Sequence, residues 1–390
     1  MKTEHQIKFA ERMNHLGTET AFEVFARAKA LEAKGRDIVH LEIGEPDFDT
    51  PRNIRDAARA ALEAGYTHYG PSAGLPEARA AIAEYVARTR KVEVDPSQVV
   101  ITPGAKPIIF FSMLALLDPG DEVIYPDPGF PIYESMAQYI GARRVPLPLT
   151  EENNFAFDPD QLESLITKRT RLVITNSPHN PTGGVLPRAT IARLAELAVK
   201  HDFYVLSDEI YSRIIYEGEN HTPYSYPGMP ERTIILDGHS KTYAMTGWRL
   251  GYGVMPAQMA LKVAKLQTNS NSCTCSFTQM AGIEALRGPQ DDVDAMIREF
   301  RTRRDLVVDG LNKIPGFRCH RPDGAFYVFP NISATGKTSK EMENFLMETA
   351  GVAVLAGTSF GPGGEGFIRL SYANSQANLK KAIERIASAV

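Results

Sequence analysis

The chain has 390 residues, which is long for a single hydrophobic core and suits two domains. With 43% hydrophobic and 23% charged residues it has the composition of a globular protein, and a net charge of −4 gives no basic field for nucleic acid. No apolar run approaches the roughly 18 residues of a membrane span, and the segment from Met1 to Lys8 is too polar for a secretory signal. We therefore expect a cytoplasmic protein without nucleic-acid or membrane partners.

The three cysteines suggest neither a disulfide framework nor a metal site. Cys273 and Cys275 form a C-x-C pair, but no His or Cys partner stands nearby at the spacing that a zinc site needs. We expect both of them, together with Cys319, to be reduced thiols with packing roles, and we expect no bound metal.

The N-terminal region is predicted to be helical and then to turn. Apolar residues recur at helical spacing within 8–36, which predicts one helix over this range. A short strand over 38–43 then meets Gly44, where the missing side chain leaves room for a ligand or simply permits a turn. The loop around Tyr69 is rich in glycine and proline and opens another helix, and such loops often carry function.

From about residue 97 to residue 255, short apolar runs alternate with amphipathic helices. Strands are predicted at 99–101, 121–125, 172–175, 204–206, 233–236 and 250–254, and helices at 107–117, 131–140 and 188–201. This alternation predicts an α/β fold in which a mainly parallel sheet is sandwiched by helices. In such sheets ligands bind beyond the carboxyl ends of the strands.

The end of the chain changes character after two long helices, predicted at 257–272 and 290–312. A smaller α+β unit follows, with strands near 325–329, 352–355 and 367–371 and helices at 339–350 and 375–388. Because one chain end often packs on the other, we expect the N-terminal segment to join this unit. The predicted domains are 1–45 (an N-terminal arm and part of the small domain), 46–288 (the large ligand-binding domain) and 289–390 (the C-terminal small domain).

Chemically distinctive residues follow the predicted strands. They are Asn180 after 172–175, Asp208 and Tyr211 after 204–206, Ser240 and Lys241 after 233–236 with Arg249 eight residues on, and Gly104, Ala105 and Lys106 at a helix start. A helix N-terminus binds phosphate through its N–H groups, and a serine and an arginine could add donors. A phosphorylated aldehyde that joins a lysine, and whose ring nitrogen wants a carboxylate, is pyridoxal phosphate.

These motifs resemble those of the pyridoxal-phosphate-dependent aminotransferases of class I/II, the aspartate aminotransferase superfamily of fold type I. The resemblance runs from about residue 20 to the C-terminus and rests on N-P-T-G at 180–183, S-D-E-I-Y at 207–211, S-K at 240–241 with Arg249, and R-L-S at 369–371. The chain departs from the commonest lysine motif at Gly238, where a serine would add a phosphate hydroxyl. The resemblance implies ping-pong transfer of an amino group from an L-amino acid to a 2-oxo acid.

The resemblance also implies catalytic roles for three residues. Lys241 would form a Schiff base with the cofactor and later move the proton of the substrate α-carbon. Asp208 would pair with the pyridine nitrogen and keep it protonated. Tyr211, together with Asn180, would hydrogen-bond the phenolic oxygen of the ring.

Binding roles are implied in the same way. Gly104, Ala105, Lys106, Ser240 and Arg249 would surround the phosphate, and Tyr69 would reach the phosphate of a neighbouring subunit, so a homodimer with a shared active site is expected. Phe130 would stack on the ring, unless it is only a core residue. The substrate α-carboxylate would be clamped by Arg369, with help from Gly44 and Asn180.

The side chain of the substrate is less well defined. Lys106 stands where some bacterial aspartate aminotransferases carry a lysine for the distal carboxylate, which favours aspartate and 2-oxoglutarate. Glu23 near the same place would instead suit a basic substrate, such as arginine with pyruvate as acceptor. If these two side chains pair with each other or face solvent, a neutral substrate such as alanine fits as well.

Other classes of function use similar sequences. Pyridoxal-phosphate lyases and oxidases employ the same residues, and the stoichiometric formation of a 2-oxo acid with a second amino acid distinguishes a transaminase from them. A transcription regulator with an aminotransferase-like half is disfavoured, because no DNA-binding helix pair precedes the fold. A P-loop or dinucleotide-binding enzyme is disfavoured because neither glycine motif follows a strand.

Overall fold

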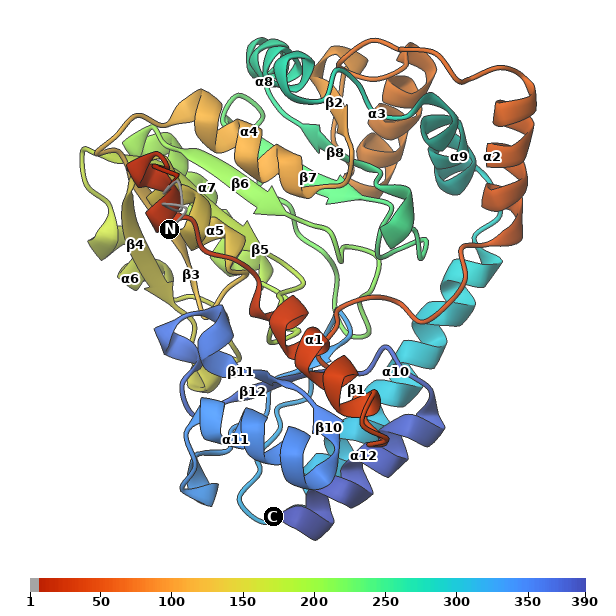
Figure 1. The fold of residues 1–390 in the computed structure, drawn as a ribbon. Coiled ribbons are helices and arrows are strands. Elements are labelled where there is room, and N and C mark those ends of the chain that lie inside the picture. The colour runs from red at the N-terminus through yellow and green to blue at the C-terminus, as the bar shows by residue number, and fades with distance from the viewer. Residues whose placement is uncertain (1–6) are drawn as a thin grey trace, which may run out of the picture.

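A computed structural model describes residues 7–390 (Figure 1). Most of the polar N-terminal segment, and the start of the predicted arm, therefore lie outside the described residues. Within 7–390 no helix is both long and apolar enough to cross a bilayer. The same residues contain no group of three or more His, Cys, Asp or Glu side chains arranged to hold a metal ion.

A seven-stranded sheet forms the centre of the larger part, in the order β2-β8-β7-β6-β5-β3-β4. The strands are β2 (Val99–Thr102), β3 (Glu122–Asp127), β4 (Arg143–Pro148), β5 (Thr170–Asn176), β6 (Tyr204–Asp208), β7 (Thr233–Gly238) and β8 (Gly251–Val254). Neighbouring strands from β4 across to β7 are parallel, and only β8 runs antiparallel to both of its neighbours. The mainly parallel α/β sheet expected from the sequence is confirmed.

Helices cover both faces of this sheet (Figure 1). They are α2 (Arg52–Glu63), α3 (Pro76–Arg90), α4 (Lys106–Leu116), α5 (Ile132–Tyr139), α6 (Pro159–Leu165), α7 (Arg188–His201), α8 (Ala257–Ser270) and α9 (Ser276–Arg287). Alternate residues of β5 serve the two faces: Leu172 and Ile174 belong to the cluster that contains α4 and α5, whereas Val173 belongs to the one that contains α7. Burial on both faces explains why β5 reads as a continuous apolar run.

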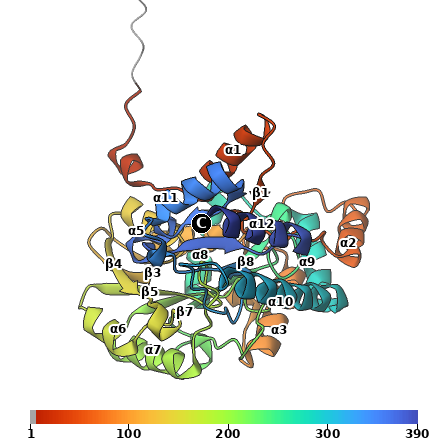
Figure 2. The same cartoon turned by 90° about the horizontal axis from the view of Figure 1, so that it is seen from below.

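The second part joins the two ends of the chain. Its elements are α1 (Thr20–Glu32), β1 (Val39–His40), α10 (Asp291–Leu311), β9 (Tyr327–Val328), α11 (Ser339–Phe345), β10 (Val352–Ala353), β11 (Leu355–Ala356), β12 (Ile368–Ser371) and α12 (Gln376–Ala389). β1 pairs with β10, and β11, β12 and β9 form an antiparallel sheet. Both views place α1 against these C-terminal elements, and α10 runs from the larger part into this one (Figures 1 and 2). The domain boundaries given above remain predictions.

The predicted helix over 8–36 is wrong for its first half. The α-helix begins only at Thr20, and the described residues before it contain only a short 3-10 turn at Glu11–His15. That turn buries no residue, so no apolar face holds a longer helix in place. The segment is instead tied to α5 by a hydrogen bond from the Gly17 N–H to the Ser135 hydroxyl, at 2.9 Å.

Three further elements were not predicted: β4, α6 and α9. β4 lies at the edge of the sheet and contains Pro146 and Pro148, residues that oppose a central strand but are compatible with an edge. The residues of β8 also do not indicate that this strand runs antiparallel, because the relative direction of a strand depends on which strands lie beside it.

Candidate active site

A cavity of about 500 Å³ lies beyond the carboxyl ends of β5, β6 and β7, where the two parts of the molecule meet. Its lining comes from the segment before α1, the turn after β1, the starts of α4 and α5, the strand ends and the small antiparallel sheet. The predicted site residues that line it are Gly44, Ala105, Lys106, Phe130, Asn180, Asp208, Tyr211, Ser240, Lys241, Arg249 and Arg369. The volume suits a small-molecule site.

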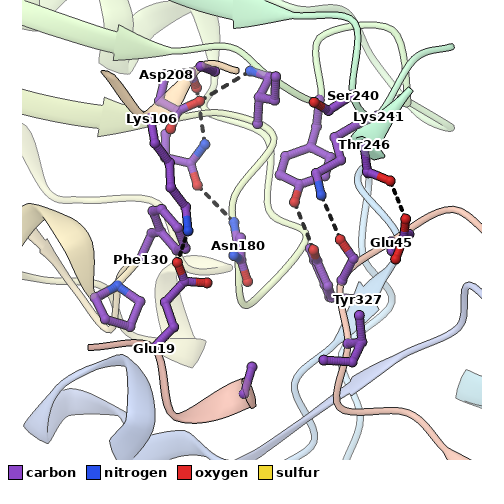
Figure 3. Close-up of a pocket in the computed structure, with 18 of the residues that line it drawn as sticks. Glu19, Glu45, Lys106, Phe130, Asn180, Asp208, Ser240, Lys241, Thr246 and Tyr327 are labelled. Atoms are coloured by element: carbon purple, nitrogen blue, oxygen red, sulfur yellow. Dashed lines mark hydrogen bonds and ion pairs between the residues drawn. The ribbon is translucent and has the colours of Figure 1, made fainter. Parts of the chain in front are cut away.

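Lys241 reaches the cavity from the loop that follows β7. Every residue of β7 is buried, and the strand ends at Gly238, so the apolar run delivers the lysine directly beyond the sheet. Its Nζ donates a hydrogen bond to the carbonyl oxygen of Gly44 at 2.6 Å (Figure 3). Burial lowers the pKa of Lys241 to about 8, against the opposing charges of Glu45 and Glu19. A lowered pKa increases the fraction of the lysine that is a neutral, nucleophilic amine near neutral pH.

Asp208 ends β6 on the other side of the cavity and is buried. Its carboxylate accepts hydrogen bonds from the Tyr133 hydroxyl at 2.6 Å and from the Ile210 N–H at 3.2 Å. Burial nevertheless raises the pKa of Asp208 to about 7, because the ionised form is costly away from water. A cationic partner in the cavity would relieve this cost.

Behind these two residues lies a buried charge cluster of Arg90, Glu209 and Asp237. The Arg90 guanidinium at the end of α3 donates to Glu209 at 3.0 Å and to Asp237 at 2.5 Å. It also donates to the Ser212 hydroxyl at 2.7 Å. Glu209 directly follows Asp208, and Asp237 lies in β7. The cluster therefore joins the ends of the two strands that supply the carboxylate and the lysine.

Arg369 is a buried cation that also lines the cavity. Its guanidinium lies over the rings of Tyr327 and Phe360, 4.6 and 4.9 Å from their centroids. One nitrogen donates to the Asn180 side-chain oxygen at 3.1 Å, and another donates to the backbone carbonyl of Glu42. Within residues 7–390 its Nε has no hydrogen-bond partner. A buried donor of this kind is suited to a carboxylate ligand.

Tyr327 and Gly44 form a tight contact beside Lys241. The Tyr327 hydroxyl shares a hydrogen bond of 2.7 Å with the hydroxyl of Tyr211 (Figure 3). A Cβ atom on Gly44 would lie only 2.1 Å from the Tyr327 hydroxyl oxygen. Glycine at position 44 is therefore required by the close approach of the tyrosine, and a turn alone does not explain it.

The start of α4 forms a third wall, with Ser240 and Arg249 as neighbouring donors. Arg249 has a φ of 53° and its guanidinium packs against Gly104, where a Cβ would lie 2.1 Å from the nearest guanidinium nitrogen. Gly104 thus does not line the cavity itself; it leaves the space that Arg249 occupies. Ala105 stands at the N-terminus of the helix, where N–H groups are available to an anion.

Besides Gly104, two predicted residues do not line the cavity. Tyr69 is 90% exposed, and its proposed contact with a neighbouring subunit stays a prediction. Glu23 is exposed on α1 and does not line the cavity, so the expectation that it stands beside the substrate is not met. Its place is taken by Glu19, which forms an ion pair with Lys106 (Figure 3).

Sequence reasoning missed Tyr133, Tyr327 and Glu19. The two tyrosines carry no charge and read as ordinary core aromatics, and only the fold brings their hydroxyls to Asp208 and Tyr211. Glu19 stands four residues before Glu23, which is one helical turn in the predicted helix. That spacing was a usable signal, although α1 in fact begins just after Glu19.

Known proteins resemble this chain over nearly its full length. Residues 36–386 match the family described as aminotransferase class I and II. The aspartate aminotransferase of Pyrococcus horikoshii is 43% identical over 392 residues, covering 100% of this chain and 99% of that protein. The arginine–pyruvate transaminase of Pseudomonas aeruginosa is 42% identical over 367 residues, covering 94% and 93%.

Solved structures agree with these relatives. The aspartate aminotransferase from Thermus thermophilus with maleate has a TM-score of 0.94 at 40% identity, and the match covers 99% of this chain and 100% of that one. An alanine aminotransferase from Pyrococcus furiosus has a TM-score of 0.93 at 33% identity, over 98% and 99% of the two chains. With the central sheet and the cavity at its strand ends, these similarities show that the chain belongs to the class I and II aminotransferases.

Proposed function

We propose that this aminotransferase uses pyridoxal phosphate, attached through a Schiff base to Lys241, to move the α-amino group of an L-amino acid to a 2-oxo acid in a ping-pong cycle. The observation that carries the proposal is the meeting of three groups in one cavity: the amine of Lys241, the buried carboxylate of Asp208 and the buried guanidinium of Arg369. An amine, a counter-ion for a ring nitrogen and a carboxylate clamp are the groups that this chemistry needs.

The residues of the cavity fit this cofactor. The ionised form of Asp208 is disfavoured by burial, and a protonated ring nitrogen beside it would stabilise that form. The N-terminus of α4, Ser240 and Arg249 offer N–H, hydroxyl and guanidinium donors for a phosphate. Phe130 supplies an aromatic face to the same space.

Pyridoxal phosphate, when bound, supplies an aldehyde that condenses with amines and a ring that accepts the electron pair left by the departing α-proton. Arg369 holds the substrate α-carboxylate and so fixes the orientation of the α-carbon. The Nζ of Lys241 would take the proton from the substrate α-carbon and pass it to the carbon that the cofactor contributes as its aldehyde. Tyr211, whose hydroxyl is already hydrogen-bonded to that of Tyr327, and Asn180 would hold the phenolic oxygen of the cofactor.

For the substrate side chain we favour an acidic group, as in aspartate and 2-oxoglutarate, bound by Lys106. Lys106 lines the cavity and lies across it from Lys241 (Figure 3), and its side chain is 47% exposed, so it is able to move toward a ligand. Relatives named as aspartate aminotransferases support this choice. The similar proteins also include an arginine–pyruvate transaminase and an alanine aminotransferase, so these two specificities are the alternatives. A lyase or an oxidase on the same scaffold is a further alternative.

We further propose that the enzyme works as a cytoplasmic homodimer with a shared active site. Tyr69 projects from the larger part with its side chain 90% exposed, which suits a contact to a second copy. Ile7, Phe9, Met13 and Leu16, in the segment before α1, are also exposed apolar side chains that a partner could cover. Figure 2 shows the start of this segment extending away from the body of the chain.

The experiment that tests the reaction class follows both products. Purified holoenzyme is mixed with aspartate and 2-oxoglutarate, and oxaloacetate, glutamate, ammonia and hydrogen peroxide are all measured. A transaminase forms oxaloacetate and glutamate in equal amounts and no ammonia or peroxide. Ammonia in place of glutamate would identify a lyase, and peroxide would identify an oxidase.

A further inference from the structure

Glu19 is an acidic side chain inside the cavity with no role in the chemistry described above. It stands immediately before α1, and its carboxylate forms an ion pair with the Nζ of Lys106. Figure 3 shows the two side chains pointing toward each other beside Phe130, across from Asn180. Only 18% of the Glu19 side chain is exposed, so its charge is turned toward the cavity and away from bulk water.

The ion pair lies in the same cavity as Lys241 and Arg369, the groups proposed to hold and react with the substrate. Under the proposed function Arg369 holds the α-carboxylate and Lys241 faces the α-carbon, and both groups feel the negative charge of Glu19, which acts to raise the pKa of each. Phe22, Phe130 and Phe360 line the same cavity. An uncharged side chain therefore meets aromatic rings and a neutral ion pair.

We propose that Glu19 is a specificity-determining residue: its carboxylate competes with the distal carboxylate of an acidic substrate for Lys106. This inference rests on the proposed function, in which Lys106 binds the acidic side chain. The presence of Glu19 therefore lowers the ratio of kcat/KM for acidic amino acids to that for uncharged ones. The same carboxylate is the group that a basic side chain would contact.

The physical reason is a competition of like charges for one ammonium. An incoming carboxylate has to displace Glu19 from Lys106, and afterwards two carboxylates share the space around a single cation. An uncharged side chain leaves the ion pair intact and does not meet this repulsion. Because Lys106 is about half exposed, water screens the effect, and we expect it to be about tenfold in binding or in kcat/KM.

The test compares Glu19→Gln with Glu23→Gln in the holoenzyme. Each change removes one negative charge, at positions four residues apart. Glu23 serves as the control because it is exposed and does not line the cavity. E19Q is expected to raise the ratio of kcat/KM for aspartate to that for phenylalanine by about tenfold, whereas E23Q leaves the ratio unchanged. Thermal unfolding of each variant shows that the fold is retained.

A binding measurement supports the kinetics without depending on turnover. Succinate carries two carboxylates and butyrate one, so only succinate can bridge Arg369 and Lys106. Calorimetry with the holoenzyme is expected to show that E19Q binds succinate about tenfold more tightly and butyrate with unchanged affinity.

The outcomes separate this inference from the function on which it rests. If K106M lowers kcat/KM for aspartate but E19Q changes neither the ratio nor succinate binding, the role of Glu19 is overturned and Lys106 keeps its role. If K106M leaves kcat/KM for aspartate unchanged, Lys106 does not bind the distal carboxylate and both statements are wrong. An equal effect of E19Q and E23Q would also overturn the inference, because it would show a long-range charge effect.

Discussion

Asp208 and Lys241 face one cavity from the ends of two adjacent parallel strands. Asp208 is the last residue of β6 and pairs in register with Leu236 of β7, and the chain then needs five more residues to reach Lys241. The carboxylate and the amine are thus placed by strand pairing, which is rigid, and by a short loop. A cofactor held at the two points would be aligned without any movement of the sheet.

The first prediction concerns the charge of Asp208. We expect Asp208→Asn to lower kcat by roughly 10²- to 10⁴-fold, because a neutral amide cannot keep a ring nitrogen protonated. Steady-state kinetics at saturating cofactor measure this. The Tyr133 hydroxyl can still donate to the asparagine oxygen, so the local structure should persist. Unchanged kcat in D208N would contradict the assignment.

The same substitution has an opposite effect on the stability of the cofactor-free chain. Burial raises the pKa of Asp208 to about 7, above the ~3.9 of an unfolded aspartate. The folded chain therefore keeps a proton that the unfolded chain releases, and Asp208 reduces stability progressively as the pH rises from about 4 to about 7. Urea unfolding should find D208N more stable than the parent chain at pH 7, with the difference shrinking toward pH 4.

The second prediction concerns the buried cluster behind the site. Arg90→Met leaves Glu209 and Asp237 buried without their cation, which typically costs about 3–5 kcal/mol of unfolding free energy. Arg88→Met is the control, since Arg88 is exposed on the same helix. Urea unfolding at pH 7 compares the two. A loss of less than about 1 kcal/mol in R90M would show that the cluster does not hold the two strand ends together.

The third prediction concerns the contact of Gly44 with Tyr327. In Gly44→Ala the new Cβ would fall 2.1 Å from the tyrosine hydroxyl oxygen, so either the turn or the ring has to move. We expect kcat/KM to fall about 10- to 100-fold, because a displacement of about 1 Å beside the lysine misaligns the reacting groups. In a Tyr327→Phe background, which lacks that oxygen, the same G44A change should cost much less. Equal losses in both backgrounds would refute the steric explanation.

The sequence predicts the place of a residue when that place follows from a strand pattern, but not when it depends on the packing of distant elements. Lys241, Asp208 and Asn180 follow buried apolar strands, and the ends of parallel strands meet at one edge, so their convergence was predictable from the pattern. Tyr133 and Tyr327 were not predictable, because their contacts depend on how distant elements pack. β4, with its two prolines, has no strand signal and exists because it pairs along β3.

The position of Glu19 shows a different limit. Periodicity over 8–36 indicated a helix but could not locate its start, and the start decides which glutamate faces the cavity. The sequence left open whether Glu23 stands beside the substrate or faces solvent, and in the structure Glu23 is exposed while Glu19, four residues earlier, lines the cavity.

The most direct test of the central claim is a single-turnover experiment on Lys241. Holoenzyme is mixed rapidly with aspartate, the visible absorbance of the bound cofactor is followed, and 2-oxoglutarate is then added. We predict that aspartate converts the absorbance within one turnover, that 2-oxoglutarate restores it, and that Lys241→Ala with the same cofactor content converts roughly 10⁴-fold more slowly. Conversion at a comparable rate in K241A, or no conversion of the loaded wild-type enzyme by aspartate, glutamate, arginine or alanine, would contradict the account.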